Sequence, residues 1–164
     1  MAVDVQYEND GAFAAGVVFN EWSADSPERT CVCKIPAVEE YVPGQFYKRE
    51  LPCILQLLND HQLTPTYILI DGYVYLDGHS TPGLGKHLSD ALHGNVKIIG
   101  VAKTPFSKIG PEFEILRGGS KKPLYVTSIG EELSAAKAKI VSMHGQYRIP
   151  TLLKKVDQAS RQIR

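Results

Sequence analysis

The chain has 164 residues, a length that allows one compact domain with a substantial core. Its apolar content of 43% and charged content of 22% are typical of a soluble globular protein rather than a disordered or membrane-embedded one. The formal net charge is zero, which excludes a general positive field for nucleic acid, so such binding would need local basic patches. Three basic pairs are candidates for such patches: Lys48/Arg49, Lys121/Lys122 and Lys154/Lys155.

The first third of the chain has the pattern of three strands. Residues 2–7 form a short apolar run that ends at the turn signal 8-ENDG-11, and residues 12–19 return as a second apolar run. These two segments are expected to form a hairpin. After a polar loop at 23–28, residues 30–35 alternate between apolar and polar and predict a third strand.

A helix is predicted next. Four apolar residues repeat at the helical spacing i, i+3, i+4 and i+7: Leu51, Ile54, Leu55 and Leu58. Proline is tolerated in the first turn of a helix, so Pro52 places the predicted start near Arg49 or Glu50.

Helices and strands alternate in the rest of the chain. Strands are predicted at 67–70, 96–102, 113–116 and 124–128, and helices at 82–93, 131–143 and 151–163. Gly94 is the expected stop of the helix at 82–93. The order predicts an α/β fold with a ribonuclease H-like mixed sheet, in which antiparallel hairpin strands lead into parallel strands flanked by helices. We expect residues 1–164 to form a single domain.

Four carboxylates stand out by their positions in these elements. Asp4 interrupts the first apolar strand, Glu50 begins the first long helix, Asp71 ends a buried strand, and Asp157 flanks the apolar stripe of the last helix. A carboxylate at the edge of a core is costly unless it is paired or binds a cation. Taken singly, each also has a simpler explanation: a turn acceptor, a favourable charge at a helix start, a turn former before a glycine, and a solvated charge.

Taken together, the four acids indicate a metal-dependent site. Ligands of α/β proteins gather at the carboxyl ends of central strands. Magnesium prefers oxygen ligands, and paired metals stabilise both the attacking and the leaving oxygen in phosphodiester cleavage. Acids on a first strand, a middle strand and helices form the layout of ribonuclease H-like nucleases, an analogy at the level of the fold.

Six stretches, in order along nearly the whole chain, resemble the endonuclease V family. They are 3-VDVQY-7, 41-YVPGQFYKRE-50, 68-ILIDG-72, 83-GLGKHL-88, 98-IIGVAK-103 and 147-YRIP-150. The block from YVPG to RE, followed by IDG and GVAK, is the most specific part of the resemblance.

The resemblance implies roles for individual residues. Asp4, Glu50 and Asp71 match catalytic, metal-binding acids, and Asp157 matches a metal-binding position on the last helix. Lys103 matches a catalytic lysine that contacts the phosphate near the cut.

Further residues match positions that contact nucleic acid. Tyr41, Val42 and Pro43 match a wedge loop, and Gly44 and Gly72 match glycines near the pocket for an extruded base. This agrees with physical expectation, because a base must leave the stack to be read and apolar wedges help to separate it.

The implied activity is Mg²⁺-dependent hydrolysis of DNA, with Mn²⁺ as a possible substitute. The cut falls one bond beyond the 3′ side of a deaminated base such as hypoxanthine, in DNA repair, and inosine in RNA is a further substrate class. The implied partner is therefore DNA or RNA, and we expect a monomer that does not bind membranes.

The segment at 73–82 departs from the family, which usually has a histidine and a second glycine where this chain has Tyr73 and Val74. His79 cannot be equated with the family's histidine, because the spacing from Asp71 to Gly83 is one residue longer. The departure leaves two alternatives open: a nuclease of the same chemistry with a different target, such as flaps, branched or mismatched DNA, or RNA; and a nucleic-acid-binding module without catalysis.

Cysteines and histidines give no sign of a zinc site. Cys31 and Cys33 alternate in an apolar run and would point to the same side of a strand, and with Cys53 they form an odd set without a pairing framework. We therefore expect a reducing, cytoplasmic environment. No basic region followed by a long apolar core begins the chain, and no apolar run approaches the roughly 20 residues of a membrane helix, so neither a signal peptide nor a membrane span is expected.

Overall fold

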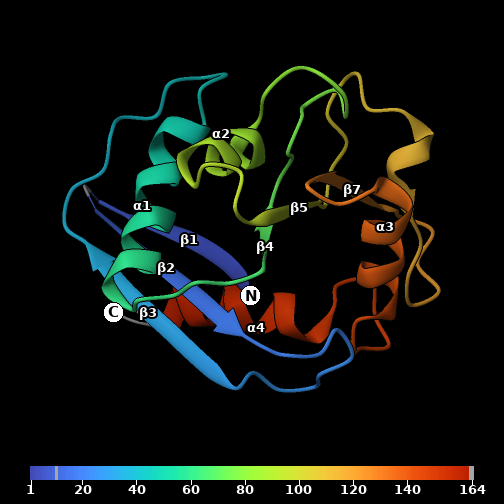
Figure 1. Ribbon diagram of the computed structural model, residues 1–164, viewed down its shortest axis with the longest axis horizontal. Helices are drawn as coiled ribbons and strands as arrows, with labels where there is room; N and C mark the ends of the chain where they lie inside the picture. The colour runs from blue at the N-terminus through green and yellow to red at the C-terminus, as the bar shows by residue number, and fades with distance from the viewer. Residues whose placement is uncertain (10, 163–164) are drawn as a thin grey trace.

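A computed structural model describes residues 1–9 and 11–162, and it contains a seven-stranded mixed sheet with helices on both faces (Figure 1). The strand order across the sheet is β3-β2-β1-β4-β5-β7-β6. The strands are β1 (Ala2–Glu8), β2 (Gly11–Val18), β3 (Arg29–Ile35), β4 (Tyr67–Asp71), β5 (Lys97–Ala102), β6 (Glu114–Ile115) and β7 (Leu124–Ile129).

The pairing confirms the predicted mixed sheet. β1, β2 and β3 pair antiparallel in sequence, with Ala2 opposite Val17 in the hairpin. β1, β4 and β5 run parallel through the centre. Beyond β5 the pairing becomes antiparallel again, because β6 and β7 form a hairpin around the glycine-rich turn and β7 pairs with β5. The sheet thus has its parallel strands in the middle and antiparallel strands on both sides.

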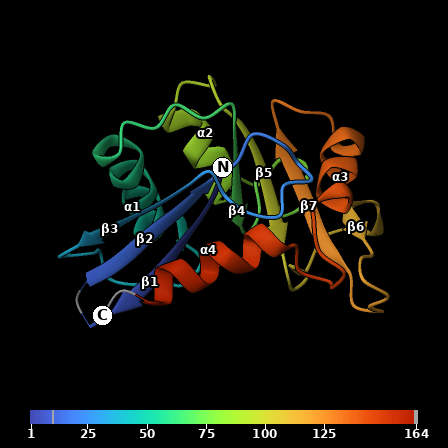
Figure 2. The same ribbon diagram turned by 90° about the horizontal axis from the view of Figure 1, so that it is seen from below.

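Helices cover the two faces in separate pairs (Figures 1 and 2). Helix α1 (Tyr47–Asp60) and helix α2 (Leu84–Ala91) lie on one face, where their apolar residues pack against strands β1 to β5. Helix α3 (Leu133–Ser142) and helix α4 (Thr151–Gln162) bury their apolar sides on the other face. The sheet is therefore buried on both faces, which explains the nearly continuous apolar sequence of β4 and β5.

Strand alternation decides which polar side chains reach the α4 face. Side chains two residues apart point to the same side of a strand. Leu69 and Val101 pack in the core beneath α3 and α4. Asp71 and Lys103, each two residues further on, therefore emerge on that same face, at the carboxyl ends of β4 and β5. The sequence of two adjacent parallel strands thus brings a carboxylate and an ammonium group to one edge of the sheet.

Helix α1 begins earlier than predicted. It starts at Tyr47, so Pro52 lies in its second turn rather than its first. Tertiary packing explains the extra residues: the Tyr47 ring stacks on His87 of α2 with centroids 3.7 Å apart, and the Arg49 guanidinium lies over the Tyr7 ring. These contacts offset the hydrogen bond that proline cannot donate inside a helix.

Helix α2 is shorter than its predicted range of 82–93. Pro82 pairs with Tyr75 in an isolated β-bridge, and Gly83 is extended, so the helix begins only at Leu84. At the other end the backbone N–H of Gly94 donates to the Ser89 carbonyl at 2.9 Å, which closes the helix and confirms Gly94 as its stop.

The other predicted boundaries need small changes. Phe113 lies in a 3₁₀ turn at Pro111–Phe113 and not in the strand predicted at 113–116, because Pro111 favours the start of a helical turn. The structure has α3 at Leu133–Ser142, inside the predicted 131–143. Helix α4 begins at Thr151 as predicted, whereas the predicted end at residue 163 lies outside the described residues.

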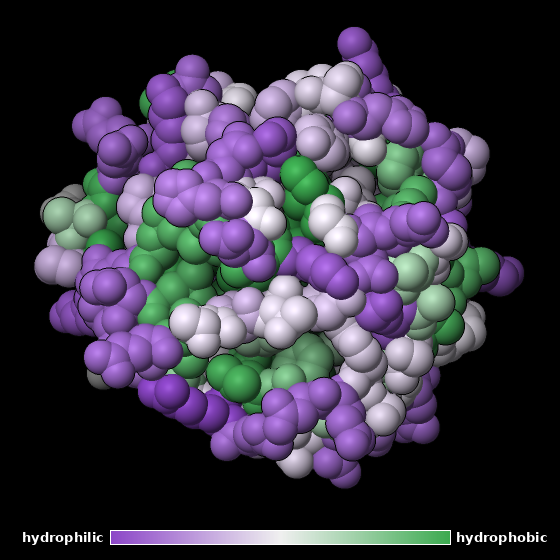
Figure 3. Space-filling model, in the orientation of Figure 1, coloured by the Kyte–Doolittle hydropathy of each residue, from purple (hydrophilic) through white to green (hydrophobic). Residues whose placement is uncertain are grey.

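The three cysteines are free and buried. On the face seen in Figure 3, hydrophilic side chains form most of the periphery and apolar side chains show in the hollows between them. Among the described helices, none is long and apolar enough to cross a membrane.

Replacing Gly100 by alanine is expected to destabilise the protein by roughly 1–2 kcal/mol, since inserted core atoms force neighbours apart. A Cβ atom at Gly100 would lie 2.4 Å from the Gly72 carbonyl oxygen and 2.7 Å from the Thr127 hydroxyl oxygen. Gly100 thus allows the chain that follows Asp71 to cross β5 closely. Urea unfolding measures the loss, and an unchanged midpoint would contradict this close approach.

Candidate active site

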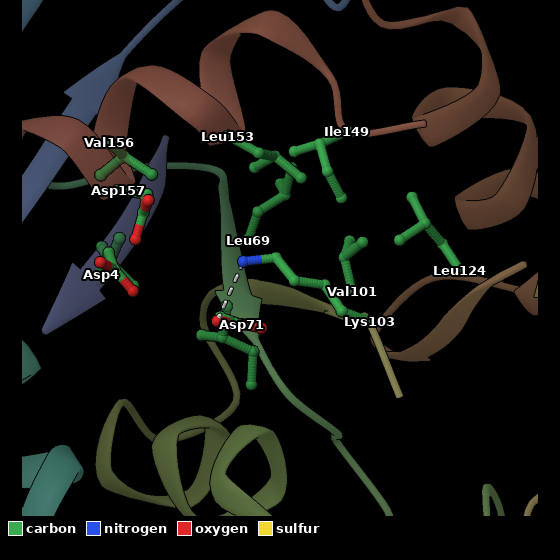
Figure 4. Close-up of a pocket in the computed structure, with 12 residues that line it drawn as sticks. Asp4, Leu69, Asp71, Val101, Lys103, Leu124, Ile149, Leu153, Val156 and Asp157 are labelled. Atoms are coloured by element: carbon green, nitrogen blue, oxygen red, sulfur yellow. Dashed lines mark ion pairs between the residues drawn. The ribbon is translucent and has the colours of Figure 1, made fainter. Parts of the chain in front are cut away.

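Four of the predicted site residues surround one small pocket on the α4 face (Figure 4). Asp4 comes from β1, Asp71 from the end of β4, Lys103 from the residue after β5, and Asp157 from α4. The pocket encloses about 30 Å³. Its other lining residues are apolar: Val3, Leu69, Ile70, Val101, Leu124, Ile149, Leu153 and Val156. The structure therefore gathers three carboxylates and one lysine that lie far apart in the sequence.

Two of these carboxylates are engaged in ion pairs. The Lys103 Nζ atom lies 3.7 Å from Asp71 Oδ2, with about half of each side chain exposed. The Asp157 Oδ1 atom accepts a hydrogen bond from Arg161 Nε at 3.1 Å, one turn further along α4. Lys103 and Arg161 thus pair with Asp71 and Asp157. Both ion pairs are weak because their side chains are partly solvated.

Asp4 has a different partner, which sequence reasoning missed. The Ser160 hydroxyl, fully buried on α4, lies 2.6 Å from Asp4 Oδ2. The pKa of Asp4 is raised from 3.8 to about 6, chiefly by burial and also by Asp71 and Asp157, while Ser160 and Lys103 oppose the shift. A signal for Ser160 was present: it lies four residues after Val156, on the apolar stripe of α4, where a hydroxyl needs a polar partner.

Glu50 approaches from the opposite face of the sheet. It sits in the first turn of α1 and is only 5% exposed. Burial raises its pKa well above the ordinary value, and Asp4 and Asp71 raise it further, whereas Arg49 lowers it. Glu50 does not line the pocket beneath α4. Its pKa is nevertheless raised by the charges of Asp4 and Asp71, which do line it. The acids therefore form one electrostatic group that spans the edge of the sheet.

The side chains of the four acids are chemically suited to bind a hard divalent cation. All four acids offer oxygen ligands, which Mg²⁺ prefers. The pKa values of Asp4 and Glu50 are raised chiefly by burial and further by the neighbouring acids, so a cation at this group would favour their ionised forms. In the described part of the chain, however, no three His, Cys, Asp or Glu side chains are already arranged to hold a metal ion. Binding would thus require side-chain movement, and the ion pairs of Asp71 and Asp157 are the contacts that would have to yield.

The stretch before Glu50 presents an apolar tip. Tyr41 and Val42 are 56% and 45% exposed, and a turn closes where the Gln45 N–H donates to the Val42 carbonyl at 2.9 Å. Gly44 has a φ of 80°, a left-handed conformation that favours glycine. The predicted contacts of Tyr41, Val42 and Pro43 with nucleic acid remain predictions, and the exposure of this loop is compatible with them.

Gly72 and Arg49 have contrasting surroundings. Gly72 has a φ of 144°, and open space surrounds the position that a Cβ atom would take. Arg49 instead packs inward: its guanidinium carbon lies 3.6 Å from the centroid of the Tyr7 ring. Arg49 therefore anchors the start of α1 to the Tyr7 ring of β1. In the basic pair Lys48/Arg49, Lys48 is the exposed residue.

His79 serves a structural purpose. Its Nε2 atom lies 3.5 Å from Glu112 Oε1, and its ring packs edge-to-face with the Phe113 ring. Asp77 closes the same loop by accepting hydrogen bonds from the backbone N–H groups of His79, Ser80 and Thr81, which hold the pKa of its carboxyl well below the usual range. The segment at 73–82 is thus an ordered loop with its own internal bonds.

Comparisons with known proteins agree with the geometry. The family model described as Endonuclease V matches residues 1–118. Endonuclease V from Streptomyces avermitilis is 32% identical over 97% of this chain and 77% of that protein. Endonuclease V from Xanthomonas axonopodis pv. citri is 34% identical over 72% of this chain but 52% of its own length.

Solved structures show the same fold. The crystal structure of endonuclease V from Streptomyces avermitilis has a TM-score of 0.76 at 28% identity, covering 98% of this chain and 78% of that one. Endonuclease V from Ciona intestinalis, solved with a 24mer DNA containing an inosine followed by a ribo-adenosine, has a TM-score of 0.74 at 21% identity, covering 98% of this chain and 83% of that one.

The mixed sheet, with acids from β1, β4, α1 and α4 at the carboxyl edge of its parallel strands, defines an α/β protein of the ribonuclease H-like class. The match over residues 1–118 and the relatives that align with nearly the whole chain are more specific. The chain belongs to the endonuclease V family.

Proposed function

We propose that this protein is a Mg²⁺-dependent endonuclease that hydrolyses a phosphodiester on the 3′ side of a deaminated base in DNA. One observation carries the proposal: Asp4, Asp71 and Asp157 meet Lys103 at the carboxyl edge of the central strands, where α/β proteins bind ligands. Membership of the endonuclease V family supports the substrate class, and hypoxanthine is the base that we expect.

The cation would be held by Asp4, Glu50, Asp71 and Asp157. When bound, it would neutralise charge on the phosphate and activate a water molecule, and Mn²⁺ would be able to replace Mg²⁺. A bound cation would also lower the pKa of Asp4 and Glu50, because an opposite charge favours their ionised forms. The four acids are consequently expected to bind metal more tightly as the pH rises through about 6, the pKa of Asp4.

Other residues would act directly on the nucleic acid. Lys103, about half exposed at the mouth of the pocket, would donate to a phosphate oxygen after leaving Asp71. Glu50 would orient the attacking water by accepting its hydrogen bond. The exposed loop with Tyr41 and Val42 would separate the bases beside the lesion, so that the base can leave the stack.

A panel of labelled oligonucleotides tests the substrate. We expect nicking of a duplex that contains one deoxyinosine, with Mg²⁺ or Mn²⁺ and not with EDTA, and weaker or no nicking of the same duplex with deoxyguanosine at that position. The panel also contains uracil and mismatched duplexes, a flap, a branched junction and an inosine-containing RNA. No cleavage of any member with either metal would overturn the proposal.

A different target is the second candidate, and it is motivated by the segment at 73–82, which differs from the family pattern in sequence. Asp77 and the bridge between Tyr75 and Pro82 hold this loop in an ordered conformation. Preferential cleavage of a flap, a junction or RNA over the deoxyinosine duplex would support this alternative, while the same metal chemistry is retained. Binding without cleavage would instead indicate a non-catalytic module.

A further inference from the structure

We infer that Tyr73, which departs from the family pattern, is a positioning residue for Lys103. This inference rests on the proposed function of Lys103. The Tyr73 hydroxyl forms two hydrogen bonds with the loop that follows Lys103: it donates to the Thr104 carbonyl at 2.7 Å and accepts from the Phe106 N–H at 3.0 Å. One hydroxyl therefore joins the first and third residues after Lys103 to the chain that leaves Asp71.

The body of Tyr73 is fixed by packing. Its side chain is 8% exposed and lies in a small apolar cluster with Ala102 and Tyr125. Ile109, from the far end of the Lys103 loop, packs against the same cluster, and the Phe106 ring meets Tyr73 edge-on at 6.3 Å between centroids. A ring held this firmly gives its hydroxyl a defined place, so the bonds to the loop are preorganised.

The backbone of Tyr73 is hydrogen-bonded to elements outside the loop. Its carbonyl accepts a hydrogen bond from Gly85 N–H at the start of α2, at 3.1 Å. The N–H of the next residue, Val74, donates to the Thr127 hydroxyl of β7 at 2.9 Å. Tyr73 thus connects the loop to both α2 and the sheet.

The carbonyl of Lys103 itself is anchored by a different residue, Arg148. The Arg148 guanidinium donates hydrogen bonds to three carbonyl oxygens. Its Nη2 donates to those of Lys103 and Pro123, and its Nε donates to that of Lys122. Arg148 holds the Lys103 carbonyl from the α4 side, whereas Tyr73 bonds to Thr104 and Phe106 from the β4 side. Lys103 and the rest of its loop are otherwise exposed from residue 103 to 108, so these anchors define where the ammonium group can reach.

Tyr73→Phe removes only the hydroxyl, and Tyr125→Phe is its matched control. Tyr125 has the same exposure and belongs to the same cluster, but no hydrogen bond of its hydroxyl is seen among the described residues. We expect Tyr73→Phe to lower the single-turnover rate on a deoxyinosine duplex by about tenfold, since small misplacements of reacting groups are costly. Tyr125→Phe should leave that rate within about twofold. Urea unfolding of both variants separates positioning from a general loss of stability.

A double-mutant cycle tests whether the effect acts through Lys103. In a Lys103→Ala background, Tyr73→Phe should cost less than about twofold. Full tenfold losses in both backgrounds would contradict positioning, as would equal effects of the two tyrosine variants.

A second readout does not depend on cleavage. Amide hydrogen exchange at Phe106 should become about tenfold faster in Tyr73→Phe and stay unchanged in Tyr125→Phe, because only the first variant loses the acceptor. If the wild-type protein cleaves no duplex, which would count against the proposed function, the same cycle is measured as affinity for the deoxyinosine duplex in EDTA. Unchanged exchange at Phe106, or additive losses of affinity, would then overturn the role of Tyr73.

Discussion

Asp71→Asn is expected to abolish cleavage of the substrate while leaving the fold intact. Asp71 ends β4 at the sheet edge, about half exposed, and its one ion pair in the described chain is with Lys103. Losing a residue that only supports a metal ligand costs 10–100-fold, so losing a ligand should lower the rate by more than about 100-fold. Asparagine keeps the shape and one oxygen of the side chain, so the loss would report the missing charge. Single-turnover cleavage at saturating Mg²⁺ measures it.

Asp90→Asn is the matched control for this substitution. Asp90 is also an exposed carboxylate paired with one lysine, Lys86, but it lies on α2 outside the pocket. Its replacement should leave the rate within about twofold, because an exposed ion pair contributes little. Comparable cleavage by Asp71→Asn and Asp90→Asn would show that Asp71 is not part of the catalytic site.

Asp4→Asn is expected to stabilise the metal-free protein at pH 8 even though it abolishes cleavage. The folded protein raises the pKa of Asp4 from 3.8 to about 6, so the folded state holds this proton more tightly than the unfolded chain. Wild-type stability therefore falls as the pH rises from about 4 to 6, and the full penalty remains above that range. At 1.36 kcal/mol per pKa unit, the penalty is about 3 kcal/mol, and a neutral asparagine that still accepts from Ser160 removes much of it.

The pH dependence and the metal dependence provide the controls for this expectation. The stability difference between Asp4→Asn and wild type should vanish below about pH 3, where Asp4 is protonated in both the folded and the unfolded state. At pH 8, Mg²⁺ should raise the unfolding midpoint of the wild type more than that of the variant, because the variant lacks one of the four charged ligands. A variant that is less stable than wild type at pH 8 and gains equally from Mg²⁺ would refute this reading of Asp4.

The fold could be predicted where local pattern and tertiary context agree. The apolar run that ends at Asp71 suits a buried strand, and the structure has one there; Gly94 marks a helix end by its backbone freedom. The start of α1 could not be placed, because the stacking of Tyr47 on His87 and of Arg49 on Tyr7 involves residues distant in sequence. Such contacts override the local preference of Pro52 for a first turn.

The charged residues of the candidate site could be predicted from the sequence, whereas the hydrogen bonds that support them could not. Asp4, Asp71, Lys103 and Asp157 do line one pocket, as strand alternation and the position of α4 require. The metal that they would hold is still a proposal. Resemblance gave no role to Tyr73, since this chain departs from the family there, and its bonds to the Lys103 loop depend on how the segment folds over β5.

Mapping the cut in a duplex with one deoxyinosine tests the central claim most directly. The wild-type protein and Asp71→Asn are each incubated with the 5′-labelled duplex in Mg²⁺ or EDTA, and the product is sized to single-nucleotide resolution. The proposed function predicts one product from the wild type in Mg²⁺, cut one bond beyond the 3′ side of the deoxyinosine, and no product in the other three reactions. Cleavage that persists in EDTA or in Asp71→Asn, or that falls at random positions, would contradict it.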